Sequence, residues 1–545
     1  MKIKGHERYD LFFEIFSYIL IAFVFLKNVF SLTSLKWPYD HDLFRDIAHA
    51  QTIADGNFFA DPNYLGETFW YNPLVPAIVA WFAELSDLAI PFVYTQAGPW
   101  LNLLGPLSFY WLVKKLFGSR AGAFACCAFL FMAPPHQPSW IVASYSPWAF
   151  ASNVTQSLFY LGLLFLIYFL EKPTWKKACG LGVLLGLTFL GHSAPAILVG
   201  SILTIWLISV FKAQKSGADL LNPLEALGYY AVILSTAFIL STPYHISILW
   251  NYGLVIKNPQ PTAWIDDLFL LNNFSGLLLQ HLTFKMGVAF IGMLLFFRRR
   301  TQENSASSFI VLSWCISGFA LFGMGYFRQV LEQGGIASFT VLPEHHFYFY
   351  LHALANIFFG YGIVVCVEHF VKIYPKRLGG ERRVLWVYLF LGLILCSATM
   401  RHFNEKEDYN RFVDRAQEIG NRIEGKNIYD WLRQNTDPDD VFLTTVGMGL
   451  YVIAPAGRKV MVLFDATFSN PYVAHEGRTG DAESIFKAIV DNDKKSFELL
   501  ATKYGVTHIF VERATSNAIN KSRPDFLKLL YEYKSVRVFK NLLTK

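Results

Sequence analysis

Charge is scarce in this chain of 545 residues. Charged residues make up 16% of it and apolar residues 54%, and the mean hydropathy is +0.34. Water-soluble domains carry about 25% charged residues, so most of this chain requires a solvent other than water. The same figures exclude a disordered, collagen-like or coiled-coil protein. The net charge is only 47 − 41 = +6, so nucleic acid is not an expected partner. The composition predicts a polytopic membrane protein.

Cysteine is also rare, and nucleotide-binding motifs are missing. There is no Walker A loop and no dinucleotide-binding glycine motif after a strand. A disulfide framework needs cysteines in polar loops, whereas all six here lie in apolar runs, which indicates small hydrophobic core residues. They are Cys126, Cys127, Cys179, Cys315, Cys366 and Cys396.

About eleven apolar runs approach the roughly 20 residues that a membrane-spanning helix needs. They are residues 11–30, 100–113, 121–134, 151–170, 178–190, 194–211, 226–241, 283–297, 309–327, 347–370 and 384–399. Residues 72–90 are apolar too, but they contain two prolines and two acidic residues. We expect them to form a helix in the membrane interface.

Basic residues gather in every second loop between these runs, and three of them precede the first run. Because basic loops stay in the cytoplasm, the N-terminus is predicted to be cytoplasmic. The first run has no small-residue cleavage site, so it is interpreted as a retained signal anchor in the plasma membrane. An odd number of spans then places the C-terminal segment outside the cytoplasm.

The outer side is predicted to carry loops 31–72, 242–282 and 328–346 and the polar segment 401–545. Within that segment, strands are predicted at 441–445, 459–464, 508–512 and 536–539, and helices at 427–434, 482–503 and 524–533, with Asp481 as an N-cap. We therefore predict two domains: a transmembrane domain over residues 1–400 and an extracytoplasmic α/β domain over residues 401–545.

Acidic residues are nearly absent from the predicted spans. Between Leu88 and Leu170 there is neither Asp nor Glu. Transporters and pumps place ionisable groups at the bilayer midplane, so this distribution favours a site at the outer membrane–water interface instead. Such a site suits a substrate with a lipid tail and a polar head.

The first outer loop is the richest in candidate chemistry. Apolar residues at helical spacing predict an amphipathic helix over residues 42–54, with Asp42 as a candidate cap and Gly56 as its stop. Asp40 would then lie at the membrane boundary, where a carboxylate can take a proton from a hydroxyl. Asp40 and Asp42 could also bind a divalent metal, Mg or Mn. The alternative is that both carboxylates only cap the helix.

The sequence "LFRDIAHAQTIADGNFF", followed by "DPNYLGETFWYNPL", is similar to the first periplasmic loop of GT-C glycosyltransferases. In aminoarabinose transferases and protein O-mannosyltransferases a span likewise ends in an acidic pair before such a helix. "KKLFGSR", "LGHSAP" and "LPEHHFYFY" resemble the same superfamily. The resemblance implies a polytopic α-helical, GT-C-like protein that transfers a hexosyl or pentosyl group from a polyprenyl-phosphate carrier to a glycan, lipid or protein acceptor. It also implies inversion at the anomeric carbon, with Asp40 as general base.

A phosphate leaving group needs cationic or hydrogen-bonding partners. The candidates on the other outer segments are His192, Lys285, Arg328, Glu344, His345 and His346. For Lys285 and Arg328 the alternative is a side chain that only reaches the lipid head groups, and for His192 it is a satisfied buried histidine. Glu344 could fix the tautomer of one neighbouring ring. Adjacent helical residues diverge, so the rings of His345 and His346 are not expected to meet one ligand.

The sequence departs from the aminoarabinose transferases in residues 134–153. Those enzymes carry a second acidic residue in the equivalent stretch, read as a metal ligand, and this chain has none there. This departure weakens the case for a metal and leaves the substrate contacts open. Three other functions also stay open. They are a ligase or polymerase of lipid-linked glycans, a transporter or lipid flippase, and a scaffold whose outer domain binds sugar.

Overall fold

The computed structural model describes residues 3–215, 221–300, 306–336, 342–373, 381–425, 427–445, 447–522, 524–534 and 536–543. Residues 337–341, in the third predicted outer loop, lie outside this set. The chain forms two compact units, each built from three segments. Unit 1 comprises Met1–Thr33, Ala97–Ser241 and Ile265–Phe412; unit 2 comprises Ser34–Gln96, Thr242–Trp264 and Val413–Lys545.

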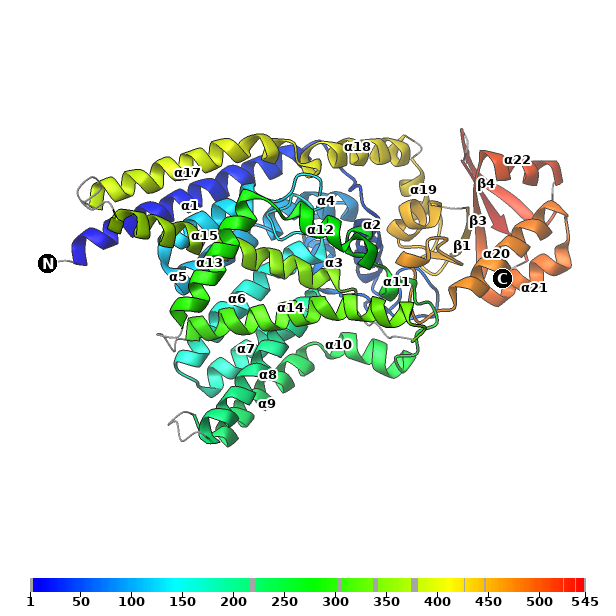
Figure 1. The fold of residues 1–545 in the computed structure, drawn as a ribbon. Helices are drawn as coiled ribbons and strands as arrows, with labels where there is room; N and C mark the ends of the chain where they lie inside the picture. Colours follow the sequence, from blue (N-terminus) through cyan, green and yellow to red (C-terminus); the bar gives the residue numbers. More distant parts are fainter. Residues whose placement is uncertain are drawn as a thin grey trace. The chain divides into compact units, whose positions relative to one another are not determined.

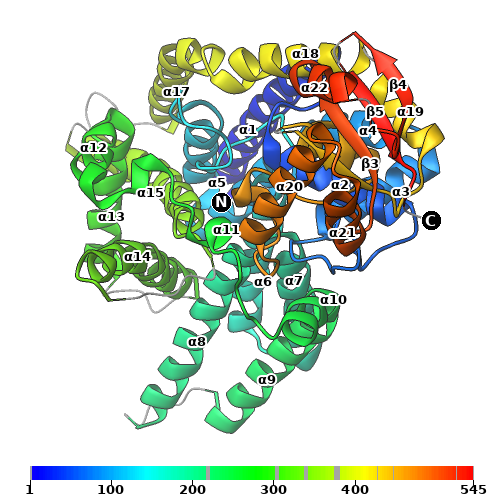
Figure 2. The same ribbon diagram turned by 90° about the vertical axis from the view of Figure 1, so that its right-hand side faces the viewer.

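Unit 1 is a bundle of long apolar helices (Figures 1 and 2). Its long helices are α1 (Ile3–Leu32), α5 (Leu104–Phe131), α6 (Ala151–Glu171), α7 (Trp175–Gly191), α8 (Ser193–Lys215), α9 (Pro223–Leu240), α13 (Phe284–Arg300), α14 (Ala306–Gln333), α15 (His345–Ile373) and α17 (Glu381–Asn404). The short helix α12 (Phe274–Gln280) precedes α13. One continuous core of aromatic and aliphatic side chains joins these helices.

Seven of the described helices are long and apolar enough to cross a membrane, and up to nine spans result if each of two bent helix pairs counts as one. The sequence predicted about eleven. The difference arises partly in α7, which has 17 residues and is shorter than a usual span. It also arises in α5, which contains two predicted spans.

Helix α5 reverses direction at Gly118, where φ is +87° and ψ is 169°. The rings of Phe109 and Phe129 stack with their centroids 4.7 Å apart. In one straight helix, residues 20 positions apart would be separated by roughly 30 Å. The residues before and after Gly118 therefore pack against each other as an antiparallel hairpin, and the basic run around Lys114 lies at its turn.

Glycines allow close helix packing in unit 1. A Cβ added at Gly292 of α13 would lie 2.1 Å from the carbonyl oxygen of Phe358 in α15. A Cβ added at Gly360 of α15 would lie 2.3 Å from the carbonyl oxygen of Ala121 in α5. Small residues that bring backbones together are typical of helix interfaces in membranes.

Unit 2 contains a five-stranded sheet in the order β2-β1-β3-β5-β4 (Figure 1). Strands β1 (Val441–Thr444), β2 (Lys459–Val460) and β3 (Val506–Glu512) are parallel, and β4 (Leu527–Tyr533) and β5 (Val536–Asn541) pair antiparallel. The helices of this unit are α2 (His41–Ala54), α3 (Leu74–Ser86), α10 (Thr242–His245), α11 (Gln260–Ala263), α19 (Ile428–Asn435), α20 (His475–Val490), α21 (Lys494–Tyr504) and α22 (Arg513–Ser522). Helices α4 (Ile90–Leu101) and α18 (Arg411–Glu424) join the two units along the chain.

The sheet of unit 2 buries both faces, because successive side chains of a strand point to opposite sides. Phe442 and Val538 belong to a core with Trp37, Phe44 and Tyr64 of the first outer loop. The neighbouring strand residues belong to a second core beneath α20, α21 and α22. The first outer loop is therefore one of the layers that cover the sheet of the α/β unit.

Polar contacts tie the first outer loop to the C-terminal segment. Arg433 Nη1 lies 3.0 and 2.9 Å from the two carboxylate oxygens of Asp55. The Tyr429 hydroxyl donates to Gln51 Oε1 over 3.0 Å. The loop is thus held to α19 by charge-assisted and neutral hydrogen bonds.

Three sequence predictions for the tail are wrong. Residues 524–533 were expected to be helical but contain β4, because pairing with β5 overrides the local helical pattern. Asp481 lies within α20, where its carboxylate accepts from Lys503 Nζ at 2.7 Å and is not an N-cap. The single helix expected over 482–503 is two helices, because Asn492 is left-handed and Asp493 caps α21.

Candidate functional site

The first candidate group surrounds the start of α2 in unit 2. Asp40 is the N-cap, and its Oδ1 accepts from the backbone N–H of Asp42 at 2.9 Å. The prediction that Asp42 caps the helix is wrong, because the helix begins one residue earlier, at His41. Gly56 follows the helix with φ +90°, as expected for its stop.

Arg45 holds the neighbouring carboxylates. Its Nη1 lies 2.6 Å from Asp42 Oδ1, and its Nη2 lies 3.1 Å from Asp46 Oδ1. Its guanidinium stacks 3.4 Å from the ring centroid of Tyr71, and Asp46 Oδ2 accepts from the Tyr94 hydroxyl at 2.9 Å. Burial alone would lower the pKa of Arg45, but the facing carboxylates raise it, so the guanidinium stays charged. Asp42 is therefore neutralised by a buried cation.

Among the described side chains, no cation forms such an ion pair with Asp40. Burial is the main cause that raises its pKa to about 7, and the negative charge of Asp42 raises it further. The more distant guanidinium groups of Arg415 and Arg45 oppose this shift only in part. A carboxyl with a pKa near neutrality can exchange a proton at physiological pH, which is the property a general base requires.

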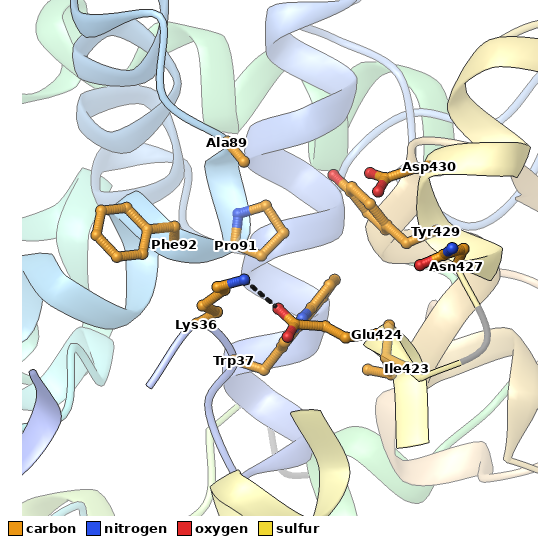
Figure 3. A pocket seen from close by; sticks show the side chains of 10 residues that line it. All are labelled: Lys36, Trp37, Ala89, Pro91, Phe92, Ile423, Glu424, Asn427, Tyr429 and Asp430. Carbon is orange, nitrogen blue, oxygen red and sulfur yellow. Dashed lines mark ion pairs between the residues drawn. The ribbon is translucent and has the colours of Figure 1, made fainter. Parts of the chain in front are cut away.

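A hollow of about 440 Å³ lies elsewhere in unit 2 (Figure 3). Lys36 Nζ and Glu424 Oε1 are 3.2 Å apart at its edge, both well exposed. The rings of Trp37 and Tyr429, which also line it, meet edge to face at 5.1 Å. None of the eight predicted site residues lines this hollow, and exposed ion pairs of this kind contribute little to stability.

Unit 1 holds a second candidate group around Lys285. A cavity of about 810 Å³ is lined mostly by apolar residues, and Lys285, His281 and His352 are among its polar members. Lys285 Nζ lies 2.8 Å from His352 Nε2 and donates to the carbonyl oxygen of Met132 at 3.2 Å. The lysine is buried, which contradicts the alternative in which it only reaches lipid head groups. An apolar cavity with an ammonium group and imidazoles fits an amphiphile with an anionic head.

Three predicted histidines come together in unit 1. The ring centroids of His345 and His346 are 4.2 Å apart, and those of His346 and His192 are 4.6 Å apart. The expectation that His345 and His346 diverge is wrong, because both stand at the very start of α15, where their rings meet each other and His192 at the end of α7.

Arg328 and Glu344 form an ion pair inside unit 1. Arg328 Nε lies 2.8 Å from Glu344 Oε1, and Arg328 Nη1 lies 3.2 Å from Glu332 Oε1. Arg328 is buried and does not reach outward as the alternative expected. Glu344 was predicted to orient a histidine ring, but its carboxylate is held by Arg328 through both oxygens.

Several solved structures share this architecture. The oligosaccharyltransferase AglB of Archaeoglobus fulgidus matches with TM-score 0.55 and 12% identity, covering 96% of this chain and 74% of that one. ArnT of Cupriavidus metallidurans matches with TM-score 0.55 and 13% identity over 96% and 97% of the two chains. The arabinofuranosyltransferase AftD from Mycobacteria matches with TM-score 0.55 and 13% identity over 96% and 40%.

This chain has the GT-C fold. No family model matches the sequence, and no characterised protein matches it by sequence alone. The long apolar helices together with the GT-C fold make it a multi-pass membrane protein, as the sequence predicted.

One GT-C structure, of AglB, contains Zn and sulfate, so the fit of a metal to Asp40 and Asp42 matters here. Within the described part of the chain, no group of three or more His, Cys, Asp or Glu residues could hold a metal ion. Asp42 is already paired with Arg45, and a cation between Asp40 and Asp42 would have to displace that guanidinium. The two carboxylates as placed do not fit a metal.

Sequence reasoning missed several residues of these groups. The pairing of Asp42 with Arg45 could have been predicted, because residues three apart on a helix are neighbours. His352 lies inside an apolar span, more than one helical turn beyond the predicted site residues His345 and His346. Lys406 and Asp408, both buried, follow α17; burial lowers the pKa of Lys406 and raises that of Asp408 to about 6. No local pattern in the sequence marks these last two.

Proposed function

We propose that this protein is a glycosyltransferase that moves a sugar from a polyprenyl-phosphate carrier to an acceptor on the extracytoplasmic face of the plasma membrane. The observation that carries this proposal is Asp40, a half-buried carboxylate with a pKa near 7, next to an Asp42 that Arg45 neutralises. The GT-C fold supports it. Structures with this fold include ArnT bound to undecaprenyl phosphate and AglB in complex with dolichol phosphate.

In the proposed step the acceptor hydroxyl oxygen bonds to the anomeric carbon while the bond from that carbon to the phosphate oxygen breaks. The hydroxyl proton passes to Asp40, and polyprenyl phosphate leaves with the electron pair. Attack opposite the leaving group inverts the anomeric centre. A phosphate is a good leaving group, so no strong general acid is needed, but its charge must be stabilised.

We assign the carrier phosphate to the cavity around Lys285. The ammonium group of Lys285 supplies the charge, His352 lies beside it, and the apolar walls suit an isoprenoid chain. Lys285 is the second residue of α13, so it stands at the beginning of a helix. A transporter would instead be expected to carry such a charge in the middle of a span.

The test uses purified protein in lipid nanodiscs and a panel of labelled polyprenyl-phosphate sugars. Release of polyprenyl phosphate is measured for the wild type, Asp40→Asn and Asp42→Asn, with and without EDTA. We expect Asp40→Asn to lower the rate by about 10² to 10⁴, the usual contribution of a general base. Asparagine caps helices as well as aspartate does, so the thermal midpoint should not fall.

Other results would redirect the assignment. Loss of activity in Asp42→Asn alone would make Asp42 the base. Loss of activity in EDTA, restored by Mg or Mn, would mean that a metal displaces Arg45 from Asp42. If the wild type consumes no donor, the proposed transfer is refuted, and lipid transport or a scaffold role takes its place.

A further inference from the structure

The hollow of about 440 Å³ in unit 2 is lined by charged groups of both signs (Figure 3). Lys36 supplies a positive charge, and Glu424 and Asp430 supply two negative charges. The side chains of Lys36 and Glu424 are 63% and 43% exposed, and Asp430 is exposed as well. These charges are therefore open to a ligand that enters the hollow.

The two opposite charges at the edge of the hollow hold each other only weakly. Lys36 Nζ lies 3.2 Å from Glu424 Oε1; Lys36 belongs to the first outer loop, and Glu424 is the last residue of α18. An ion pair between exposed side chains contributes little to stability, because water screens it. A ligand with one charge would leave one member without its partner, whereas a zwitterion offers a new partner to each. The pair therefore fits a ligand that carries both an anion and a cation.

The hollow is close to the membrane surface along the chain. Lys36 follows the last residue of α1 by 36 − 32 = 4 positions, so the length of the chain alone keeps it within about 14 Å of the end of that span. Ala89, in the wall, follows α3 by 89 − 86 = 3 positions, and α3 exposes Trp81 by 63% and Leu85 by 66%. Exposed aromatic and aliphatic side chains are typical of a helix in the membrane interface. The charged residues are thus near the level of the lipid head groups.

The walls of the hollow indicate which kind of cation fits. Quaternary ammonium groups are recognised by open aromatic faces, but Trp37 in the wall is only 4% exposed. A primary ammonium instead donates hydrogen bonds, and the carboxylates of Glu424 and Asp430 accept them. Figure 3 shows Pro91 and Phe92 across the hollow from Asp430, where they offer apolar surface to the glycerol and the first carbons of the lipid chains.

We propose that this hollow binds the head group of a zwitterionic phospholipid with a primary ammonium, as in phosphatidylethanolamine. The lipid phosphate pairs with Lys36, and the ammonium pairs with Glu424 and Asp430. A lipid held in this way fastens the start of the first outer loop to the end of α18. The site is distinct from the cavity assigned to the carrier, and the inference does not depend on the proposed transfer.

The experiment measures lipid binding without any sugar donor. The purified full chain in detergent is mixed with equal amounts of phosphatidylethanolamine, phosphatidylcholine and phosphatidylglycerol that have the same acyl chains. Native mass spectrometry then reports how much of each lipid is bound. All three carry the phosphate, but only the first carries a primary ammonium. We expect it to bind about three- to fivefold more tightly than the other two, a modest factor because the charged contacts are partly exposed.

Three variants separate the two charges of the lipid. Glu424→Gln combined with Asp430→Asn should abolish the preference for phosphatidylethanolamine, whereas Lys36→Met should weaken all three lipids alike. Glu418→Gln is the matched control and should bind like the wild type. Glu418 is also an exposed member of an ion pair on α18, 2.6 Å from Arg422 Nη2, but it does not line the hollow. All the changed side chains are exposed, so the variants should fold normally, which their thermal midpoints check.

Three results would overturn the proposal. The first is a wild type that binds the three lipids equally, and the second is a double variant that prefers phosphatidylethanolamine as strongly as Glu418→Gln does. The third is a Lys36→Met variant that binds all three lipids as the wild type does. Because no donor is present, none of these results bears on glycosyl transfer, which the release of polyprenyl phosphate measures separately.

Discussion

At the scale of single residues, the different environments of two neighbouring carboxylates predict a pH dependence. Burial and the charge of Asp42 raise the pKa of Asp40 to about 7, against partial opposition from Arg415 and Arg45. A general base works only in its deprotonated form. We therefore expect kcat/KM to be constant above about pH 7 and to fall about tenfold per pH unit below it.

Initial rates of polyprenyl-phosphate release from about pH 5 to about pH 9 would check this profile. The control is donor binding measured over the same range, which separates titration of the base from titration of the carrier phosphate. If the rate stays constant well below neutral pH, Asp40 is not the general base.

A second prediction concerns the buried ammonium group of unit 1. Lys285→Met keeps the length and apolar stem of the side chain but removes the charge assigned to the carrier phosphate. Hydrogen bonds to charged groups contribute about 1.5 to 3 kcal/mol, so the donor KM should rise at least about tenfold. The exposed Lys257 provides the control Lys257→Met, which should leave the donor KM unchanged. If both variants have the same donor KM, the carrier phosphate does not bind in this cavity.

The residue scale also shows where the sequence was sufficient. Helix α2 was predicted from local spacing to within one residue of its start, because a helix start depends on neighbouring residues. The contact of Glu344 with Arg328 was not predicted, because it joins residues 16 positions apart.

At the scale of elements, the reversal of α5 depends on one backbone conformation. Gly118 has φ +87° and ψ 169°, a region that residues with a side chain rarely adopt. Nothing lies within 4 Å of a Cβ added there, so Gly118→Ala would cause backbone strain without a clash. We expect the variant to lose about 1 to 3 kcal/mol of stability and to unfold at a lower temperature in nanodiscs.

Gly162→Ala in α6 is the matched control for that measurement. Gly162 is helical, and a Cβ added there also meets nothing within 4 Å. Alanine is favoured over glycine inside a helix by roughly 0.5 to 1 kcal/mol, so this variant should be as stable as the wild type or more so. Equal thermal midpoints for the two variants would contradict the assignment of strain to Gly118.

Elements were predicted well where lipid-facing composition determines them. Each predicted span from residues 151–170 to 384–399 coincides with a helix or part of one. The tail was predicted less accurately, because β4 depends on its pairing with β5 and on the left-handed Lys534 between them. A strand that forms because it pairs with another strand has only a weak pattern in its own sequence.

At the scale of the whole molecule, the loop charges predict an orientation that labelling can check. We expect Glu418→Cys, on the exposed face of α18, to react in intact cells with a thiol reagent that does not cross membranes. Lys176→Cys, in a predicted cytoplasmic loop, should react only after the cells are opened. Labelling of the unmodified protein measures the background from native cysteines. The opposite pattern would invert the predicted topology.

The division into two units could not be deduced from the sequence. The change in composition predicts a domain boundary at residue 400. The contacts instead group the first outer loop and residues 242–264 with the C-terminal segment. Composition reports which solvent a segment faces, whereas membership of a compact unit depends on distant partners such as Asp55 and Arg433.

The discontinuity of unit 2 has a consequence during synthesis. The first outer loop ends at Gln96 and the C-terminal segment begins at Val413, so 413 − 96 = 317 positions separate them. At roughly 5 to 20 residues per second, a ribosome needs about 15 s to a minute to cover that distance. During this interval Trp37, Phe44 and Tyr64 have no Phe442 or Val538 to cover them. A newly made chain therefore depends on a chaperone, or on the membrane surface itself, to shield this loop until its last strand arrives.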